Sequence, residues 1–168
     1  MEFDGKKGFV APQTVTIIGT YDENGVPNAM NAAWCMQSDT AELTISLGKH
    51  KTTDNFQKTG AFTVAFATVK TLVISDYFGV ETGRNVNKIE TAGVHVHKST
   101  YVNAPVIEEY PLTLECRVIY REEQDASKLP EEIIQKFYSI EKEDHISYYG
   151  EIKAAYILEE EKAEILQV

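Results

Sequence analysis

The residues Ser46 to Thr53, SLGKHKTT, combine basic and hydroxyl side chains in a pattern that could bind an anion. Lys49, His50 and Lys51 stand in a row, which is notable in a chain with a net charge of -10. If a helix begins here, its free N–H groups favour negative charge, and the threonines either cap the helix or donate to a phosphate. A solvated turn followed by an ordinary threonine cap is the competing interpretation. One phosphate is favoured over two, because the chain has no Walker or dinucleotide glycine motif.

The residues Asn28 to Trp34, NAMNAAW, have the composition of a strand that lies against a flat ligand. They include two asparagines, three alanines, a methionine and the only tryptophan of the chain, where a core strand would carry Val, Ile and Phe. Small side chains and amides allow a flat polar ligand to come close to the backbone. The alternative is a half-exposed strand on which Trp34 fills the core.

A second polar segment, residues 75–88, is punctuated by glycines. Gly79 and Gly83 allow the backbone to approach a ligand closely, and Arg84 and Lys88 would lie one helical turn apart. A long surface connection explains the same residues, so this segment alone is a weak indication of a binding site.

Three histidines are candidates for chemistry. His145 would open the last strand on its polar face, where it could donate to a cofactor or a substrate. A hydrogen bond to a neighbouring carbonyl is the structural alternative. His95 and His97 share one face of a short strand, but no carboxylate or cysteine is placed to complete a ligand set, so no metal site is predicted.

The two cysteines, Cys35 and Cys116, are isolated in the sequence and lack the neighbouring cysteines of a zinc site. Cys116 alternates with apolar residues on a predicted strand, which indicates a buried and inert thiol. Cys35 follows Trp34 and would contact whatever that strand binds.

Length and composition predict one globular domain over residues 1–168, large enough to bury a core without disulfides. With 43% hydrophobic and 25% charged residues, the chain resembles an ordinary soluble protein. The net charge of -10 disfavours nucleic acid as a partner, because such binding needs many Lys and Arg contacts with phosphates. The sequence shows no apolar segment long enough to span a membrane and no basic leader at Met1, so we expect a cytoplasmic protein without a membrane partner.

The elements that would position these residues are mostly strands with one apolar face. The alternation of apolar residues predicts strands over 15–20, 28–35, 43–47, 62–66, 112–120 and 145–159. Asn24 and Gly25 predict a two-residue type I′ turn, after which the second strand starts near Val26. Helices are predicted over 52–58, 72–78, 86–91 and 130–138, with Gly60 and Gly93 closing the first and third.

The arrangement of these elements favours an antiparallel barrel with helices packed outside, because strands and helices do not alternate regularly as in a doubly wound sheet. The unusual length of the last strand indicates pairing beyond its own barrel, across a dimer.

Taken in order along nearly the whole chain, these motifs resemble the flavin reductase-like family of FMN-binding split barrels. Further segments that carry the resemblance are Gly19-Thr20, 104–109, 114–116 and 150–152. The resemblance implies a mainly β fold with flanking helices, a six-stranded antiparallel split barrel that forms a homodimer with FMN in a groove at or near the subunit interface. It also implies NAD(P)H as the electron donor and a small molecule or a protein as the electron acceptor.

The resemblance further implies roles for single residues. Asn31 and the backbone around Ala32 and Ala33 would bond the pyrimidine side of the flavin ring, and His145 would be the catalytic residue that orients the hydride donor. The phosphate would be held by Lys49, His50, Thr52 and Thr53. The full set of predicted cofactor-binding residues is Asn28, Met30, Asn31, Ala32, Ala33, Trp34, Cys35, Ser46, Gly48, Lys49, His50, Thr52, Thr53, Tyr77, Arg84 and Lys88.

Four positions depart from the family pattern, in which threonine, arginine, cysteine and aspartate are common where this chain has Asn31, His50, Phe78 and Asn87. His50 would make phosphate affinity depend on pH, because only its protonated form carries a full charge. The segment 125–144 adds a helix that bears on nicotinamide access. Two alternatives stay open: an electron-transfer protein that binds FMN without oxidising NAD(P)H directly, and a non-redox split barrel that binds another flat phosphorylated or tetrapyrrole ligand.

Overall fold

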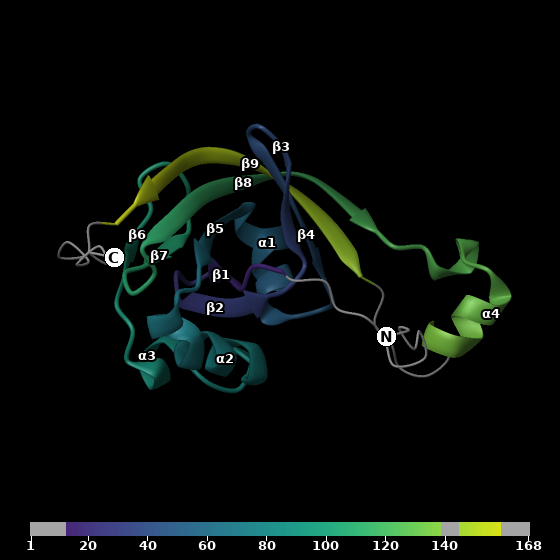
Figure 1. The fold of residues 1–168 in the computed structure, drawn as a ribbon, viewed down its shortest axis with the longest axis horizontal. Helices are drawn as coiled ribbons and strands as arrows, with labels where there is room; N and C mark the ends of the chain where they lie inside the picture. Colours follow the sequence, from purple (N-terminus) through teal and green to yellow (C-terminus); the bar gives the residue numbers. More distant parts are fainter. Residues whose placement is uncertain (1–12, 139–144, 159–168) are drawn as a thin grey trace, which may run out of the picture.

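Seven antiparallel strands form one sheet that curls into an open barrel, in the order β2-β1-β5-β8-β9-β4-β3 (Figure 1). The computed structural model describes residues 13–138 and 145–158. The strands of this sheet are β1 (Thr16–Tyr21), β2 (Pro27–Ala32), β3 (Cys35–Asp39), β4 (Glu42–Leu47), β5 (Ala61–Phe66), β8 (Leu112–Glu123) and β9 (Ile146–Ile157). The short strands β6 (Val96–Lys98) and β7 (Pro105–Ile107) pair separately. The predicted mainly β, antiparallel class is confirmed.

The two edge strands of the sheet, β2 and β3, follow each other directly in the chain. The sequence predicts one strand in their place, so the predicted count of six strands is wrong. The run from Asn28 to Cys35 forms parts of two strands, because β2 pairs with β1 whereas β3 pairs with β4. Between β2 and β3, the carbonyl of Trp34 accepts the N–H of Ser46 at 2.9 Å, so at Trp34 the chain already pairs with β4 instead of β1. The residues expected on one ligand-facing strand therefore lie on both edges of the split sheet.

The turn between β1 and β2 is a tight hairpin, but not the predicted two-residue type I′ turn. The N–H of Gly25 donates to the carbonyl of Asp22 at 3.0 Å, and Gly25 has a φ of 77°. The Asp22 carboxylate accepts the N–H groups of Asn24 and Val26, which lengthens the loop by one residue. A side chain that satisfies backbone donors thus overrides the preference of the Asn-Gly pair.

Three helices, α1 (Lys51–Thr59), α2 (Leu72–Val80) and α3 (Lys88–Ala92), flank the barrel, with a 3₁₀ turn, η1 (Val69–Thr71), before α2. Gly60 and Gly93 follow α1 and α3 at φ values of 64° and 66°, which confirms the two predicted helix ends. α3 begins at Lys88 rather than at the predicted residue 86, because the Asn87 side chain accepts the N–H of Glu90 and caps the helix there.

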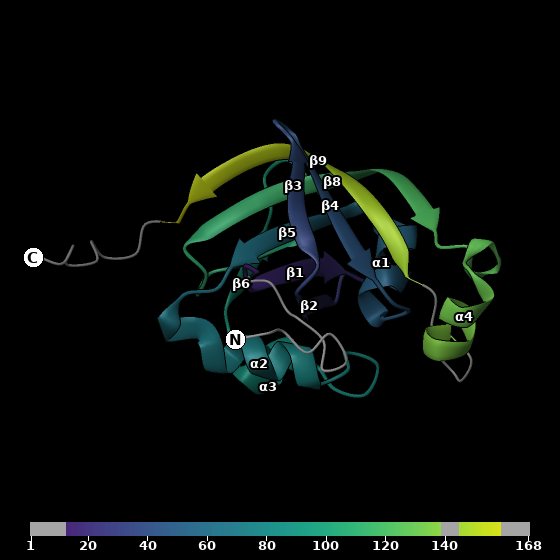
Figure 2. The same ribbon diagram turned by 45° about the vertical axis from the view of Figure 1, so that its right-hand side comes forward.

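The segment of residues 124–138, which follows β8, stands away from the barrel (Figures 1 and 2). It contains a 3₁₀ turn, η2 (Ala126–Lys128), the short α4 (Glu131–Ile133) and a π-helical turn over Ile134–Tyr138, in place of the single helix predicted over 130–138. Residues 139–144 of the predicted insertion lie outside the described residues. In the ranges 13–138 and 145–158, no helix is both long and apolar enough to cross a membrane.

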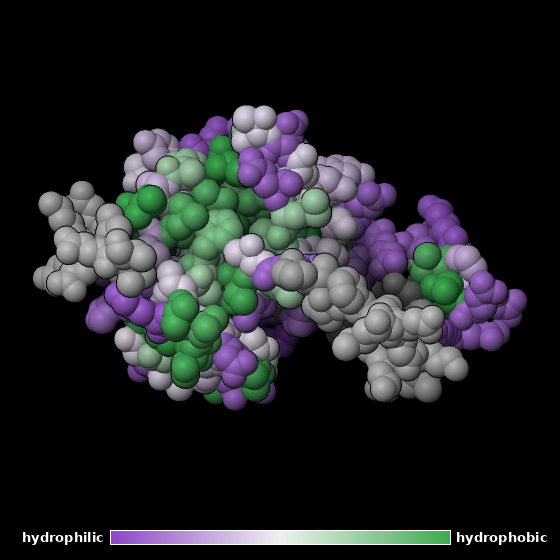
Figure 3. All heavy atoms as spheres, in the orientation of Figure 1, coloured by the Kyte–Doolittle hydropathy of each residue, from purple (hydrophilic) through white to green (hydrophobic). Residues whose placement is uncertain are grey.

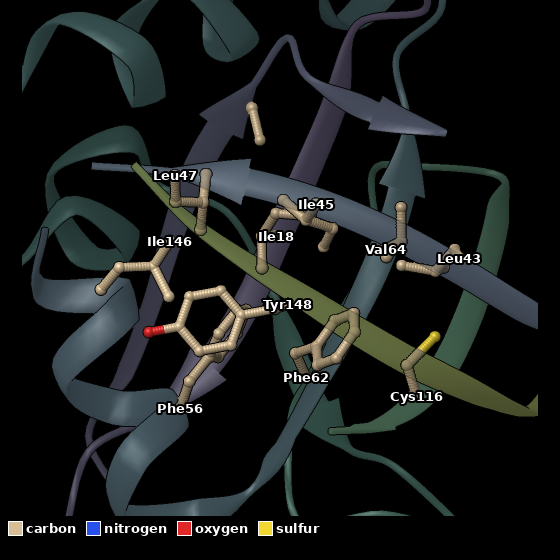
Figure 4. Packing of buried hydrophobic residues seen from close by; sticks show 11 residues of the cluster. Ile18, Leu43, Ile45, Leu47, Phe56, Phe62, Val64, Cys116, Ile146 and Tyr148 are labelled. Atoms are coloured by element: carbon tan, nitrogen blue, oxygen red, sulfur yellow. The ribbon is translucent and has the colours of Figure 1, made fainter. Parts of the chain in front are cut away.

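The barrel interior is filled by a cluster of apolar side chains that also fixes α1 (Figure 4). The ring of Phe56, on α1, lies 4.9 Å from that of Phe62 and 4.7 Å from that of Tyr148, measured between centroids. Burying a side chain of this size contributes roughly 1.5–3 kcal/mol, so these contacts hold α1 firmly on the barrel. Cys116 is fully buried in the same cluster, and burial raises the pKa of its thiol, which confirms the inert buried cysteine.

A second apolar cluster packs α2 and α3 against the sheet. It joins Ile17 and Ala29 of β1 and β2 to Phe78 of α2 and Ile89 of α3. The segment 81–87, which connects the two helices, is therefore anchored at both of its ends beside β2.

Candidate functional site

A cavity of about 280 Å³ lies between β2, the start of α1 and the end of α2 with the segment that follows it. Its walls come from three parts of the chain that are far apart in sequence. The lining residues are Asn28, Met30, Asn31, His50, Lys51, Thr52, Phe78, Gly79, Val80, Glu81, Thr82, Gly83 and Lys88. The three segments that the sequence singles out, around residues 28–34, 46–53 and 75–88, thus meet at one place.

Asn28 and Thr52 join β2 to α1 inside this cavity. The Asn28 amide donates to the Thr52 hydroxyl over 3.1 Å, and both side chains are buried. Since the hydroxyl oxygen accepts this bond, its own proton can be donated to an anion. Gly83 covers the pair so closely that a Cβ there would lie 2.1 Å from Asn28 Oδ1, so a larger residue would displace the Asn28 amide.

Thr53 has a different task from its neighbour. Its hydroxyl accepts the N–H of His50 at 2.9 Å and donates to the carbonyl of the same residue at 2.7 Å. These bonds cap the N-terminus of α1, so Thr53 fits the structural interpretation of the motif, whereas Thr52 faces the cavity. The sequence alone left both interpretations open for both threonines.

Lys88 places a buried ammonium in the cavity wall. Only 3% of Lys88 is exposed, and Nζ donates to the carbonyls of Phe78 at 2.9 Å and Glu81 at 3.1 Å. Burial lowers the pKa of Lys88 to about 8, an effect that the nearby Glu81 partly opposes. The side chain therefore ties the C-terminal end of α2 to α3 and carries a positive charge that is sensitive to mildly alkaline pH.

Arg84 and Lys51 hold the neighbouring segments in place through ion pairs. Arg84 Nη1 lies 2.7 Å from Asp54 Oδ2 on α1, and Lys51 Nζ lies 3.2 Å from Asp22 Oδ2 in the β1–β2 turn. Arg84 lines a smaller adjacent cavity of about 200 Å³, which shares Asn28, Lys51, Gly83 and Lys88 with the first. Arg84 is thus placed to position the segment 82–87 rather than to line the main cavity.

Asn31 connects β2 to α2 at the other end of the cavity. Its amide donates to the carbonyl of Ser75 at 3.1 Å, and the Ser75 hydroxyl is hydrogen-bonded to that of Tyr110 at 2.9 Å. A Cβ on Gly79 would lie 3.3 Å from Asn31 Cβ, so the helix backbone passes close to this side chain. Polar amide groups and closely packed backbone therefore line this end.

Trp34, Cys35, Ser46 and His145 lie around two other cavities, of about 610 and 630 Å³. Trp34 and Ser46 line both, Cys35 lines the first, and His145 the second. The rings of Trp34 and His145 meet edge to face, with centroids 5.1 Å apart. Trp34 is 56% exposed, so the alternative in which it fills the core is wrong. Burial raises the pKa of Cys35 to about 11, which keeps its thiol neutral.

The remaining predicted residues stand apart from the main cavity. Ala32 is buried in the barrel, where its carbonyl accepts the Thr16 hydroxyl, and Ala33 is exposed in the turn before β3. Gly48 and Lys49 precede α1 outside the cavity lining, and Tyr77 packs against the cluster beneath α2. The predicted residues that the main cavity does bring together are Asn28, Met30, Asn31, His50, Thr52 and Lys88.

Lys51 lines this cavity but was missing from the predicted set, although it belongs to the basic run that pointed to the site. Away from the cavity, His95 pairs with Glu109 at 2.9 Å and His97 with Glu108 at 3.1 Å. Among the described residues, no three His, Cys, Asp or Glu side chains are grouped as metal ligands.

Comparison with known proteins gives one family match and several similar structures. The flavin reductase like domain model matches residues 10–167. Flavoredoxin of Desulfovibrio vulgaris (Miyazaki F) is 24% identical, with a TM-score of 0.76 over 94% of this chain and 76% of that one. Flavoredoxin from Methanosarcina acetivorans is 26% identical, with a TM-score of 0.71 over 93% and 74%. An FMN-binding domain of a flavin reductases-like enzyme from Shewanella baltica OS155 is 23% identical, with a TM-score of 0.67 over 87% and 69%. No curated protein matches the chain.

Proposed function

The chain belongs to the flavin reductase-like family, whose split-barrel fold it shares, and we propose that it is a flavoprotein that passes electrons from NAD(P)H through bound FMN to an acceptor. One observation carries this proposal. The cavity beside β2 combines amide groups, a hydroxyl and ammonium groups, from three segments, in one place. The Shewanella baltica relative is itself described as FMN-binding, which supports the choice of flavin.

The start of α1 suits the phosphate of FMN. Thr52 has a hydroxyl proton to donate, Lys51 and Lys88 supply positive charge, and the N-terminus of α1 favours an anion. His50, at the N-cap position, lines the same wall. Charge-assisted hydrogen bonds of this kind are about twice as strong as neutral ones, so they are expected to supply much of the affinity.

The β2 end of the cavity suits the polar edge of a flat ring. The Asn28 and Asn31 amides lie there, and Gly79 and Gly83 bring backbone within reach of a ligand. At about 280 Å³, the cavity is slightly smaller than the roughly 300–1,000 Å³ that is usual for ligand sites. We therefore propose that it encloses part of FMN and that a second copy of the chain covers the rest.

The face drawn in Figure 3 supports such a homodimer. Hydrophobic side chains gather there over the sheet and over α2. Val69, Leu72, Val73 and Val80 of η1 and α2 are exposed, as is Met36 on the edge strand β3. Exposed apolar patches of this kind are typical of interfaces between proteins. Light scattering coupled to gel filtration tests the proposal, and a monomer at micromolar concentration would contradict it.

The chain supplies binding and orientation, whereas FMN, when bound, would supply the electron-transfer chemistry that the side chains lack. His145 is the residue proposed to orient the hydride donor. Gln124 fixes its backbone by donating to the His145 carbonyl at 2.9 Å, and Trp34 contacts its ring.

An electron-transfer protein that does not oxidise NAD(P)H directly is the second candidate, and one observation favours it. Among the described residues, the cavity at His145 is lined by three carboxylates, those of Glu122, Glu123 and Asp125, and by one lysine, Lys128. This charge balance disfavours the pyrophosphate of a nicotinamide dinucleotide.

Two measurements test these proposals. The purified full chain is titrated with FMN, and binding is expected to quench flavin fluorescence and to raise the thermal midpoint of the protein. An unchanged flavin signal would overturn FMN binding, and a haem spectrum would favour a tetrapyrrole ligand. The FMN-loaded protein is then mixed with NADH or NADPH without oxygen. Bleaching of the flavin supports the reductase, whereas persistent colour supports the electron-transfer protein.

A further inference from the structure

Tyr110 is a completely buried tyrosine that contacts the first turn of α2. Its hydroxyl lies 2.9 Å from that of Ser75, and the Ser75 hydroxyl donates to the carbonyl of Thr71 at 2.8 Å. A serine hydroxyl has one proton, so Ser75 must accept the proton of Tyr110. Burial raises the pKa of Tyr110, which keeps the phenol protonated and able to donate. A buried donor from a distant part of the chain therefore fixes the first turn of α2.

The same turn of α2 determines which way the amide of Asn31 points. The amide nitrogen donates to the carbonyl of Ser75 at 3.1 Å. The reverse orientation would place the amide oxygen against that carbonyl, and two acceptors repel each other. The oxygen, Oδ1, accepts no hydrogen bond from the residues that the structure describes. Since Asn31 lines the cavity, Oδ1 is the atom of the amide that can bind a ligand.

Asn28, the other amide of this cavity, is held differently. Its nitrogen donates to the hydroxyl of Thr52, and Gly83 covers its Oδ1. A hydroxyl can either donate or accept, so Thr52 allows both orientations of the Asn28 amide. The backbone carbonyl of Ser75 can only accept, and it therefore gives Asn31 a fixed polarity that Asn28 lacks.

We propose that Tyr110, acting through Ser75, is a positioning residue that holds the Asn31 amide with its oxygen toward the ligand. The cavity then offers a hydrogen-bond acceptor at this end, and it selects a flat ring whose edge carries an N–H group. A ring edge that has only acceptors would face the lone pairs of Oδ1 and would bind weakly. Because FMN is the proposed ligand, this selectivity rests on the proposed function, and the pyrimidine ring of FMN carries such a group at N3.

The test compares FMN with 3-methyl-FMN, in which a methyl group replaces the proton on N3. Both are titrated into the full chain, and quenching of flavin fluorescence gives the two dissociation constants. The unmodified protein should bind 3-methyl-FMN at least about tenfold more weakly, because the analogue leaves Oδ1 without a donor. Equal affinity for the two flavins would overturn the proposal and leave the FMN function standing. If neither flavin binds, the proposed function fails and the selectivity fails with it.

The variant Asn31→Leu separates the hydrogen bond from the bulk of the added methyl group. Leucine has the branched shape of asparagine but neither a donor nor an acceptor. FMN affinity should fall about tenfold and 3-methyl-FMN affinity by less than about twofold, so the ratio of the two dissociation constants approaches about one. A ratio that stays as high as in the unmodified protein would assign the discrimination to steric hindrance and overturn the proposal.

The variant Tyr110→Phe removes only the hydroxyl, and Tyr101→Phe is its matched control, because Tyr101 is exposed. Well below the unfolding temperature, Tyr110→Phe should reduce the ratio by about threefold, and Tyr101→Phe should leave it unchanged. In a Ser75→Ala background, Tyr110→Phe should have no further effect, since the hydroxyl through which it acts is already gone. A lower thermal midpoint with an unchanged ratio, or an equal effect of Tyr110→Phe in both backgrounds, would overturn the positioning role.

Discussion

Asn28 on β2 and Thr52 on α1, 24 residues apart in the chain, are joined by a buried hydrogen bond of 3.1 Å in the lining of the proposed FMN cavity. This bond connects the strand proposed to meet the flavin ring with the helix start proposed to meet the phosphate. Because the Thr52 oxygen already accepts a hydrogen bond from Asn28, the hydroxyl proton of Thr52 is available for donation to an anionic ligand. The two halves of the proposed site are thus set relative to each other before any ligand binds.

Replacing Thr52 by valine should weaken FMN binding while keeping the side-chain volume. The loss of a hydrogen bond to a charged phosphate costs about 1.5–3 kcal/mol, or roughly tenfold to a hundredfold in the dissociation constant. Titration of flavin fluorescence measures the effect. An unchanged affinity would remove Thr52 from the phosphate site.

Replacing Thr53 by alanine should lower the stability of the fold and leave FMN binding nearly unchanged. Its hydroxyl caps α1 through His50, so its loss should destabilise the fold by about 1 kcal/mol and lower the thermal midpoint by about 2–4 °C. FMN affinity at a temperature well below the transition should change little. A large loss of affinity without a change in thermal midpoint would show that Thr53 binds the phosphate instead.

Lys88 should make FMN binding weaken as the pH rises above about 8, the pKa to which burial lowers this ammonium. The FMN phosphate has already lost its second proton near pH 6, so it does not titrate over this range. The stability of the fold should change in the opposite direction and increase as the pH rises. Between pH 8 and the ordinary lysine value of 10.5, the unfolded chain binds more protons than the folded one, so the free energy of unfolding rises with pH.

The control for this prediction is Lys88→Met, which removes the charge at every pH. It should bind FMN weakly at pH 7 and show no further loss between pH 7 and 10. Affinity measured by flavin fluorescence and stability measured by urea unfolding separate the two effects. If the pH profile of Lys88→Met matches that of the unmodified protein, another group controls binding.

The ion pair between Arg84 and Asp54 should act on FMN indirectly. Both side chains are nearly half exposed, so the pair itself is worth less than about 1 kcal/mol. Arg84→Ala and Asp54→Asn should each weaken FMN binding by less than about tenfold, and the double variant should lose no more than either single one, because all three break the same contact. A much larger effect of Arg84→Ala alone would mean that the guanidinium contacts the phosphate directly.

The sequence predicted which segments line the cavity. It did not predict which residue of a segment faces the cavity and which one stabilises the local structure. The basic run, the Asn-rich strand and the glycine-punctuated loop follow from local composition, and all three line one cavity. Which threonine caps and which faces the cavity depends on the residue at which α1 begins, since each step around a helix turns the side chain by about 100°. That boundary is set by the bonds between Thr53 and His50, which no local pattern specifies.

Non-local pairing explains the other differences. The break between β2 and β3 at Ala33 and Trp34 arises because the two strands pair with β1 and β4, partners distant in sequence from each other. The alternative in which Trp34 fills the core fails for the same reason, because the break leaves Trp34 exposed beside His145. The burial of Lys88 likewise depends on carbonyls of α2 and the segment after it.

Replacing His145 by alanine should separate flavin binding from flavin reduction. The residue lies outside the proposed FMN cavity, so FMN affinity should stay within about twofold of the unmodified protein. If its ring orients the hydride donor, reduction of bound FMN by NADH or NADPH in stopped-flow mixing should slow by about tenfold or more, because misplacing a reactant by 1 Å can cost about a hundredfold. Asn and Gln at this position serve as comparisons, since each keeps a donor without the imidazole. An unchanged reduction rate in all three variants would assign His145 to support of Trp34 alone, and loss of FMN itself would make its role structural.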